Sequence, residues 1–170
     1  GNEAIRDSRY AFRRHFFQHA GFRYVISDQK IAEFTDFYED DQEITPFCEL
    51  DYGQDIFKLG NFAQKLVEIS KPYIQGRMRV LNLGCSTGRC SFELAGYCEK
   101  VIGIDFTARL IKVAERMKTH KKIKYQLIEE GEITSFKDAS LAEYGLEDVV
   151  EKVEFWQADA SNLAGKFNNY

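Results

Sequence analysis

Residues 79–88 read RVLNLGCSTG and residues 101–105 read VIGID, and these two stretches decide the fold. Each contains a short apolar run of strand length; the first leads into a glycine-rich turn and the second ends on an acid. Short apolar runs bounded by turn residues are typical of buried strands. The intervening residues 89–98 can form a helix that packs Phe92 and Ala95. Because parallel strands need such a crossover, the sequence predicts an α/β protein with a parallel sheet.

The alternation of helices and strands continues on both sides of this unit. Upstream, Asn61 can cap a helix that stops near Gly76. The apolar residues of this helix recur at helical spacing, at Phe62, Leu66, Ile69 and Tyr73. Downstream, Thr107 can cap another helix, and residues 153–159 (VEFWQAD) predict a third strand. Between them lies a longer excursion, in which Ile123, Tyr125 and Leu127 alternate like a strand and residues 139–151 can be helical.

Three polar or glycine-rich corners follow the three predicted strands, at residues 84–88, Asp105 and Asp159. Ligands of parallel sheets bind beyond the carboxyl ends of the strands, so these corners are expected to meet at one rim. Glycine is needed where the backbone turns sharply and where a ligand must approach it closely. The carboxylate of Asp105 can accept hydrogen bonds from both hydroxyls of a ribose. The rim therefore fits either a dinucleotide or an adenosyl ligand.

The order of residues within the loop separates these two ligands. A nicotinamide-dinucleotide fingerprint requires G-x-G-x-x-G, whereas this loop reads G-C-S-T-G followed by Arg89 and Cys90. The pattern hydrophobic–polar–x–Gly–x–small–x–Gly instead resembles motif I of class I S-adenosylmethionine methyltransferases. Two positions depart from that family: Asn82 stands where an acid is usual, and Ser86 where a middle glycine is often found. Asn82 can accept a hydrogen bond, but it lacks the charge that favours the methionine ammonium group.

This resemblance implies a Rossmann-like class I methyltransferase fold with S-adenosylmethionine as the cofactor. In the family, the acid at the position of Asp105 binds the ribose, and the corner at Asp159 and Ala160 contacts the adenine amino group. The implied cofactor-binding residues are Asn82, Gly84, Cys85, Ser86, Gly88, Asp105, Phe106, Asp159 and Ala160. Tyr52 is a candidate aromatic wall at the acceptor or cofactor entrance, and packing in the core or linker is the alternative.

Composition limits the other functions of this 170-residue chain. It is 44% hydrophobic and 14% aromatic, which favours a packed core over disorder. No apolar run reaches the length of a membrane span and no signal-peptide h-region is present, so a cytoplasmic protein without membrane contact is expected. The net charge of −4 gives no indication of a basic surface that would bind nucleic acid. The four cysteines form no C-x-x-C pair, and no acid follows His15 and His19 at ligand spacing, so no metal site is expected.

The charge is distributed unevenly along the chain. Residues 1–35 and residues 58–170 each carry a net charge of +2, whereas residues 36–57 hold eight acids and no base. Such a shift of composition is a candidate boundary. The sequence therefore predicts the tail of one domain at 1–35, a solvated acidic linker at 36–57 and a second domain at 58–170. An acidic binding surface is the alternative for the middle part.

Both flanking parts resemble one family of fused enzymes. The N-terminal segments GNEA (1–4) and RYAFRRHFFQHAGFR (9–23) look like the end of the formylglycine-generating-type domain of sulfoxide synthases that make ovothiol. The methyltransferase domain fused to those synthases is similar to the segments LNLGCSTGRCSFELA (81–95), VIGIDFTARLI (101–111), YQLIEEGEI (125–133) and VEFWQADASNL (153–163). The resemblance covers nearly the whole chain, and residues 15–23 are its most specific part.

The wider resemblance implies a bifunctional enzyme of ovothiol biosynthesis, a 5-histidylcysteine sulfoxide synthase joined to a 4-mercaptohistidine N-methyltransferase. Iron belongs only to the synthase domain, whose iron-binding histidines are expected upstream of this chain. Tyr10 and Arg13 are the tail residues expected to face the synthase pocket, as a redox tyrosine and a carboxylate partner, with packing of a domain end as the alternative. A ring nitrogen of the small-molecule substrate would attack the methyl group, and a neutral imidazole needs no base. No catalytic residue of the methyl transfer is therefore assigned.

The chain begins at Gly1 and reaches only the third strand of the family's longer sheet, so it is expected to be a fragment that is truncated after that strand and inactive alone. The missing strands would pair beside the first strand, whose edge is then expected to be open. Two other functions remain as alternatives. One is a methyltransferase of another small molecule, and the other is a non-catalytic Rossmann-like remnant or interaction module with an empty rim.

Overall fold

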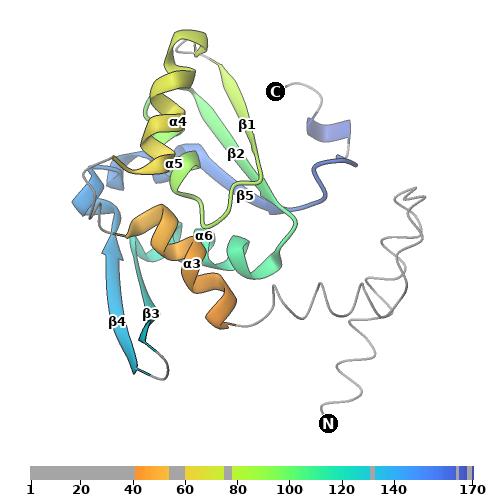
Figure 1. The fold of residues 1–170 in the computed structure, drawn as a ribbon. Coiled ribbons are helices and arrows are strands. Elements are labelled where there is room, and N and C mark those ends of the chain that lie inside the picture. The colour runs from red at the N-terminus through yellow and green to blue at the C-terminus, as the bar shows by residue number, and fades with distance from the viewer. Residues whose placement is uncertain (1–40, 54–59, 75–77, 131–132, 164, 168–169) are drawn as a thin grey trace, which may run out of the picture. The chain divides into compact units, whose positions relative to one another are not determined.

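The structure of the protein is a computed structural model that describes residues 41–53, 60–74, 78–130, 133–163, 165–167 and 170 (Figure 1). These residues all fall within one compact unit, residues 35–170. The domain tail expected at 1–35, with Tyr10 and Arg13, lies outside the described residues.

Three parallel strands form the central sheet: β1 (Arg79–Leu83), β2 (Lys100–Asp105) and β5 (Val153–Gln157). They lie in the order β1-β2-β5, and Gly103 of β2 stands opposite Phe155 of β5. The middle strand β2 is buried along most of its length, which explains why its sequence is apolar up to the final acid. The expected Rossmann-like α/β fold with a parallel sheet is confirmed.

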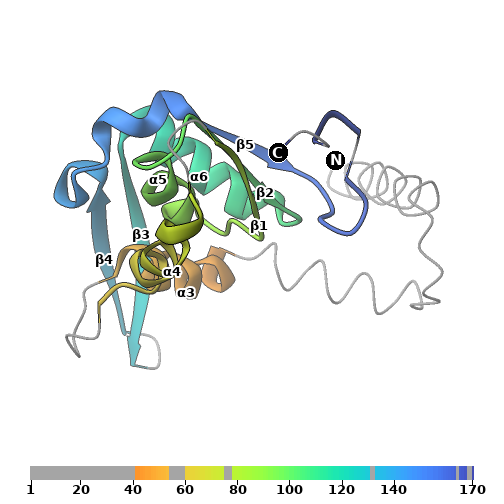
Figure 2. The ribbon, with the colours of Figure 1, turned by 90° about the horizontal axis from the view of Figure 1, so that it is seen from above.

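Helices cover one face of this sheet (Figures 1 and 2). They are α4 (Phe62–Ser70), α5 (Arg89–Ala95) and α6 (Ala108–His120). Val67, Phe92 and Met117, one from each helix, are buried together with Val101 and Val153 of the sheet in the larger core. No helix in the described ranges is long and apolar enough to cross a membrane.

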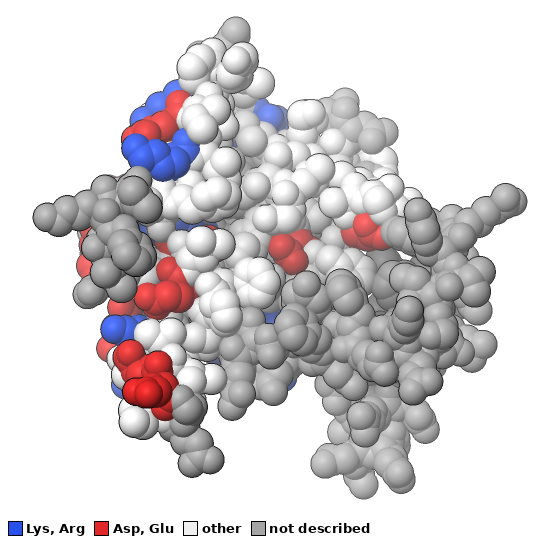
Figure 3. Space-filling view, viewed as in Figure 1, with Lys and Arg blue, Asp and Glu red and all other residues white. Residues whose placement is uncertain are grey.

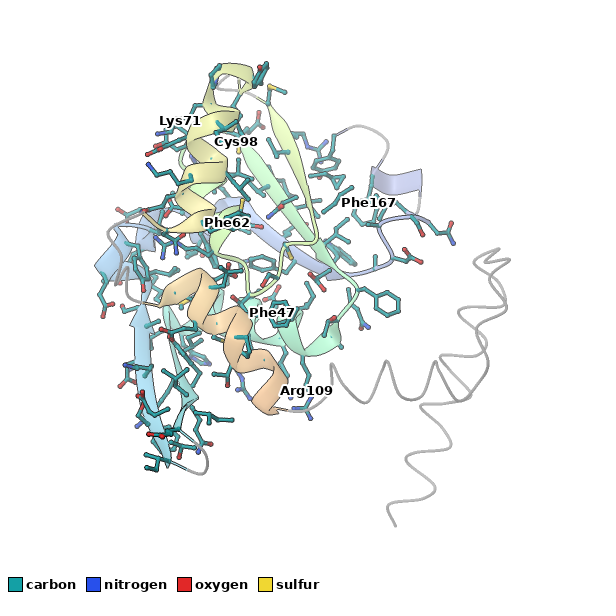
Figure 4. All side chains as sticks on the ribbon, in the orientation of Figure 1. Phe47, Phe62, Lys71, Cys98, Arg109 and Phe167 are labelled. Atoms are coloured by element: carbon teal, nitrogen blue, oxygen red, sulfur yellow. The ribbon has the colours of Figure 1, made fainter. Side chains whose placement is uncertain are left out.

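The other face of the sheet is covered by the segment that follows β5. Ile102 and Ile104 of β2 pack there with Phe167 of the short 3-10 helix η4 (Gly165–Phe167). In Figure 4 the labelled Phe167 lies across the sheet from α4. The sheet therefore has apolar contacts on both faces, as parallel sheets require.

Helix α4 begins at its predicted cap. The side chain of Asn61 accepts hydrogen bonds from the backbone N–H groups of Ala63 (2.9 Å) and Gln64 (3.3 Å), which satisfies donors that the first turn leaves free. The helix passes at Ser70 into the 3-10 helix η1 (Lys71–Tyr73). The apolar stripe is exposed along its length, at Phe62, Leu66, Ile69 and Tyr73. Ala63 and Val67 are the buried residues instead, because small side chains let α4 approach α5 closely.

An antiparallel hairpin, β3 (Lys122–Glu130) and β4 (Ile133–Ser140), lies between α6 and β5 and is separate from the central sheet. The strand expected in this excursion is therefore confirmed. The helix expected over 139–151 is wrong, because the chain there forms the end of β4 and two 3-10 helices. These are η2 (Leu141–Tyr144) and η3 (Glu147–Lys152), and Gly145, at φ +67°, separates them.

The segment expected to be a solvated acidic linker contains helix α3 (Asp41–Tyr52). This helix packs on β3, α4 and α5, and Cys48 and Tyr52 on it are buried. Ile44, Cys48 and Tyr52 recur every four residues and so share one helical face, which the abundance of acids obscures. Where it is described, the segment is thus packed rather than solvated, and the domain boundary within it stays a prediction.

Candidate functional site

The chain leaves β1 in a tight loop that remains attached to the middle strand. The backbone N–H groups of Gly84 and Cys85 both donate to the carbonyl oxygen of Ile104, at 2.8 and 3.0 Å. The N–H of Gly88 then donates to the carbonyl of Cys85 at 3.0 Å, which closes the loop before α5 begins. The loop is therefore held at the carboxyl end of the sheet.

Two glycines of the loop adopt backbone angles that other residues rarely adopt. Gly84 has φ +75° and Gly88 has φ +96°. A Cβ atom on Gly84 would meet nothing within 4 Å, so the backbone there is open to a ligand. A Cβ atom on Gly88 would lie 2.7 Å from the Phe155 ring and 3.0 Å from Ala114. Gly84 thus leaves room for close approach, whereas Gly88 permits close packing.

Asp105 holds the middle of the loop from the end of β2. Its Oδ2 atom accepts a hydrogen bond from the backbone N–H of Ser86 (3.0 Å), and its Oδ1 atom accepts one from Thr107 (2.9 Å). An ionised carboxylate has about four acceptor sites, so each oxygen can still accept a hydrogen bond from a ligand hydroxyl. The loop and Asp105 therefore lie together at the rim, as expected from the sequence.

Asp159 reaches the same rim two residues beyond β5. The backbone N–H of Ala158 donates to the carbonyl oxygen of Asp105 (3.0 Å), which joins the two corners. The Oδ1 atom of Asp159 accepts hydrogen bonds from the N–H and the hydroxyl of Ser161, at 2.8 and 2.7 Å. Within the described part of the chain these bonds use only Oδ1, and Oδ2 remains available to a donor such as an amino group.

The other residues implied by the resemblance differ in their surroundings. Phe106 and Ala160 are exposed beside the two aspartates. The side-chain amide of Asn82 donates to the hydroxyl of Ser91 (2.9 Å). Cys85 is buried, and burial raises the pKa of its thiol. Cys85 is therefore no reactive thiolate at neutral pH.

Ser86 combines two unusual features. Its φ is +53°, a left-handed conformation that costs a non-glycine residue about 1–2 kcal/mol. Its hydroxyl oxygen is buried; it meets no strict hydrogen-bond geometry among the described residues, but it interacts with the Asp51 carboxyl and lowers the pKa of that group. Strained backbone conformations of this kind are concentrated at functional sites, so Ser86 makes the centre of the loop a candidate for ligand binding.

Helix α3 contributes contacts to the loop that sequence reasoning missed. The carboxylate Oδ2 of Asp51 accepts hydrogen bonds from both the backbone N–H and the hydroxyl of Thr87, and the hydroxyl of Tyr52 donates to the Thr87 carbonyl at 2.9 Å. All three side chains are buried. Tyr52 therefore supports the loop from inside, in keeping with the packing alternative, and its contact with a substrate stays a prediction. No local signal distinguishes Asp51 from the other acids of its segment.

Arg89 is the second contributor that the sequence does not identify. It is 1% exposed, and its guanidinium pairs with Glu93 at 2.8 Å. The guanidinium carbon also lies 3.6 Å from the centre of the Tyr144 ring, and Nη1 donates to the backbone carbonyl of Asp51 at 3.4 Å. The first residue of α5 is thereby joined to both α3 and η2.

Asp51 gives the fold a testable pH dependence. Burial raises the pKa of its carboxyl, and the hydrogen bonds from Thr87 and Ser86 and the charge of Arg89 offset only part of that effect. The folded state therefore binds this proton more tightly than the unfolded state does. As the pH rises from about 4, where a free aspartate ionises, through the raised pKa, the free energy of unfolding is expected to fall.

Urea unfolding of wild type and Asp51→Asn over that pH range measures this effect. Because the variant has no carboxyl to ionise, its free energy of unfolding should improve relative to wild type as the pH rises. Two parallel curves would show that the Asp51 carboxyl has the same pKa in both states.

The loop offers little to a phosphate group. The backbone N–H groups of Ser86, Thr87 and Gly88 already donate to Asp105, Asp51 and a loop carbonyl respectively. A bound pyrophosphate needs free N–H groups, and two carboxylates would repel it. On the face drawn in Figure 3, basic and acidic side chains lie together over α4, while acidic side chains stand in an otherwise uncharged middle. The site therefore favours a ligand that lacks phosphate and carries positive charge.

Comparison with known proteins gives one family. Residues 74–155, just under half of the chain, match the family described as "Methyltransferase domain". No curated protein matches the chain in sequence.

Several solved structures are similar to it. The YcgJ protein of Bacillus subtilis shares 21% identity at a TM-score of 0.38, over 61% of this chain and 32% of that one. Magnesium protoporphyrin IX methyltransferase from Synechocystis PCC 6803, with bound S-adenosylmethionine, shares 17% sequence identity at a TM-score of 0.45. The match covers 85% of this chain and 60% of that one. Phosphoethanolamine N-methyltransferase 1 of Haemonchus contortus shares 15% sequence identity at a TM-score of 0.47. The match covers 84% of this chain and 24% of that one. The chain thus spans about a third of the length of the Bacillus protein.

Proposed function

We propose that this chain binds S-adenosylmethionine at the rim and belongs to an enzyme that transfers its methyl group to a small molecule. One observation carries the proposal: the N–H groups of loop residues 86–88 are occupied, two of them by the carboxylates of Asp51 and Asp105. That arrangement disfavours a dinucleotide and suits a cationic adenosyl ligand. The methyltransferase family match of residues 74–155 supports the same conclusion.

The residues at the rim fit this cofactor. Asp105 keeps acceptor sites for both ribose hydroxyls, and Oδ2 of Asp159 can accept from the adenine amino group. The open backbone at Gly84 gives the methionyl part room, and Ser86 follows two residues later in the same loop. Exposed Phe106 can stack on the adenine ring. Asn82, Cys85, Gly88 and Ala160 complete the proposed cofactor-binding set.

The bound cofactor supplies a methyl group on a positively charged sulfur, which a nucleophile takes as the sulfur–carbon bond breaks. The chain's own contribution is to hold the reactants aligned, and alignment alone can supply a large part of the rate. The carboxylates of Asp51, Asp105 and Asp159 give the rim a negative charge that favours a cation. A neutral ring nitrogen can attack without a base, so no side chain is assigned that role.

For the methyl acceptor we propose 4-mercaptohistidine. This assignment rests on the resemblance of residues 9–23 and of the methyltransferase segments to the fused enzymes of ovothiol biosynthesis. The iron-dependent synthase activity would belong to a domain upstream of residue 1, with Tyr10 and Arg13 at its edge. A different small-molecule acceptor is the second candidate, because the rim residues recognise the cofactor and not the acceptor.

Two measurements test the proposal. Calorimetry should detect binding of S-adenosylhomocysteine and no binding of NAD at the same concentration. Binding of NAD without binding of S-adenosylhomocysteine would overturn the cofactor assignment. With methyl-labelled S-adenosylmethionine, the protein in its full-length form should transfer label to 4-mercaptohistidine, and histidine serves as the matched control acceptor. Cofactor binding without transfer to 4-mercaptohistidine would overturn the acceptor alone.

A further inference from the structure

Thr87 is held by helix α3 at every polar atom it has. Its N–H and its hydroxyl both donate to Oδ2 of Asp51, and its carbonyl oxygen accepts from the hydroxyl of Tyr52. Thr87 itself is fully buried, and Asp51 and Tyr52 are 6% and 4% exposed. Figure 4 shows α3, with its labelled Phe47, lying against the loop between β1 and α5. The centre of the loop is therefore attached to a helix 35 residues earlier in the chain.

The loop is thus fixed from two sides at successive residues. Asp105 accepts the N–H of Ser86 from the sheet, and Asp51 accepts the N–H of Thr87 from α3. Between these attachments the backbone of Ser86 is in the left-handed conformation, at φ +53°. Strained residues of this kind persist only where the surroundings over-determine them. Without Asp51, the hydroxyl of Tyr52 would be the remaining α3 contact to the Thr87 backbone among the hydrogen bonds described.

A buried carboxylate is a costly way to attach a loop. Taking a charge out of water costs several kcal/mol before its partners compensate. The compensation comes from the two Thr87 donors, from the Ser86 hydroxyl and from Arg89. The Arg89 guanidinium also donates to the Asp51 carbonyl oxygen. A neutral contact would stabilise the fold more cheaply. Asp51 and Thr87 therefore compensate each other's burial where α3 meets the loop.

We propose that the end of α3 is a positioning element of the cofactor site: Asp51, through Thr87, keeps the loop in the conformation that binds the cofactor, although neither residue has to touch it. The inference rests on the proposed function. It makes α3, which lies outside the strand–helix–strand unit that carries the loop, a part of the site.

The test removes one hydroxyl. Thr87→Val keeps the shape of the side chain and deletes the donor to Asp51, whereas Thr87→Ser keeps the donor. The matched control is Thr45→Val on the same helix, which deletes a hydroxyl that donates to the Gln126 carbonyl at 2.6 Å, away from the loop. Calorimetry with S-adenosylhomocysteine should show about tenfold weaker binding for Thr87→Val, and changes within about twofold for Thr87→Ser and Thr45→Val.

Hydrogen exchange without ligand gives an independent measurement. The amides of residues 86 and 88 should exchange faster in Thr87→Val than in Thr45→Val, with both variants folded. Equal loss of affinity in the two valine variants, or wild-type affinity and exchange in Thr87→Val, would overturn the positioning role. If wild type itself binds no S-adenosylhomocysteine, the proposed function fails, and the positioning role fails with it.

Discussion

Replacing Asp105 with alanine is expected to weaken S-adenosylhomocysteine binding by at least about a hundredfold. The ribose hydroxyls would lose two hydrogen bonds to a charged acceptor, each worth about 1.5–3 kcal/mol. The N–H groups of Ser86 and Thr107 would lose their acceptor as well, so the loop would be less ordered before the ligand arrives. Calorimetry of the folded variant measures the change, and Asp105→Asn, which keeps one acceptor, should fall between alanine and wild type.

An analogue of the ligand without ribose hydroxyls separates the two effects of this substitution. Wild type should bind the analogue much more weakly than S-adenosylhomocysteine, whereas Asp105→Ala should bind both about equally. If the alanine variant still discriminates between them as wild type does, another residue binds the ribose, and Asp105 acts only on the loop.

Replacing Arg89 with methionine is expected to lower the free energy of unfolding by about 3–5 kcal/mol, the usual cost of removing one member of a buried ion pair. The Arg89 side chain is 1% exposed and that of its partner Glu93 is 13% exposed, so the remaining carboxylate would be left largely without water. The contact with the Tyr144 ring and the hydrogen bond to the carbonyl of Asp51 would be lost too. Urea unfolding monitored by circular dichroism measures the change.

Two further variants identify the cause. The double variant Arg89→Met with Glu93→Leu should recover part of the loss, because no buried carboxylate then remains unpaired. Lys65→Met is the matched control, since Lys65 pairs with Glu68 at 3.1 Å but both side chains are more than half exposed. Its cost should stay below about 1 kcal/mol. Equal costs for Arg89→Met and Lys65→Met would show that burial of the Arg89 pair contributes nothing.

The arrangement of the rim could be predicted because it follows from strand order. The carboxyl ends of parallel neighbours share one edge of the sheet, so residues 84–88 and Asp105 have to meet once two strands and a crossover are recognised. The same argument places Asp159 beside them, although β5 ends two residues earlier, at Gln157. The apolar pattern of a buried strand is local in sequence, so the strand can be recognised without knowledge of its neighbours in space.

Contacts between distant segments could not be predicted in this way. Helix α4 has a pronounced apolar stripe, yet small Ala63 and Val67 are buried because α5 approaches that side. The residues after α6 form a separate hairpin and two 3-10 helices, where propensity alone permits a longer helix. Which face of an element is buried depends on its neighbours, and these are absent from a local pattern.

The sequence by itself determined the parallel sheet and the loop and acid of the rim, because periodicity and glycine spacing act over a few residues. Only the tertiary structure decided that α3 contacts the loop at the rim. Asp51 looks like seven other acids in a charged segment, and its burial against Thr87 comes from packing 36 residues along the chain. An aspartate reads the same in the sequence whether its carboxylate is solvated or buried. Its surroundings in the folded protein decide between the two.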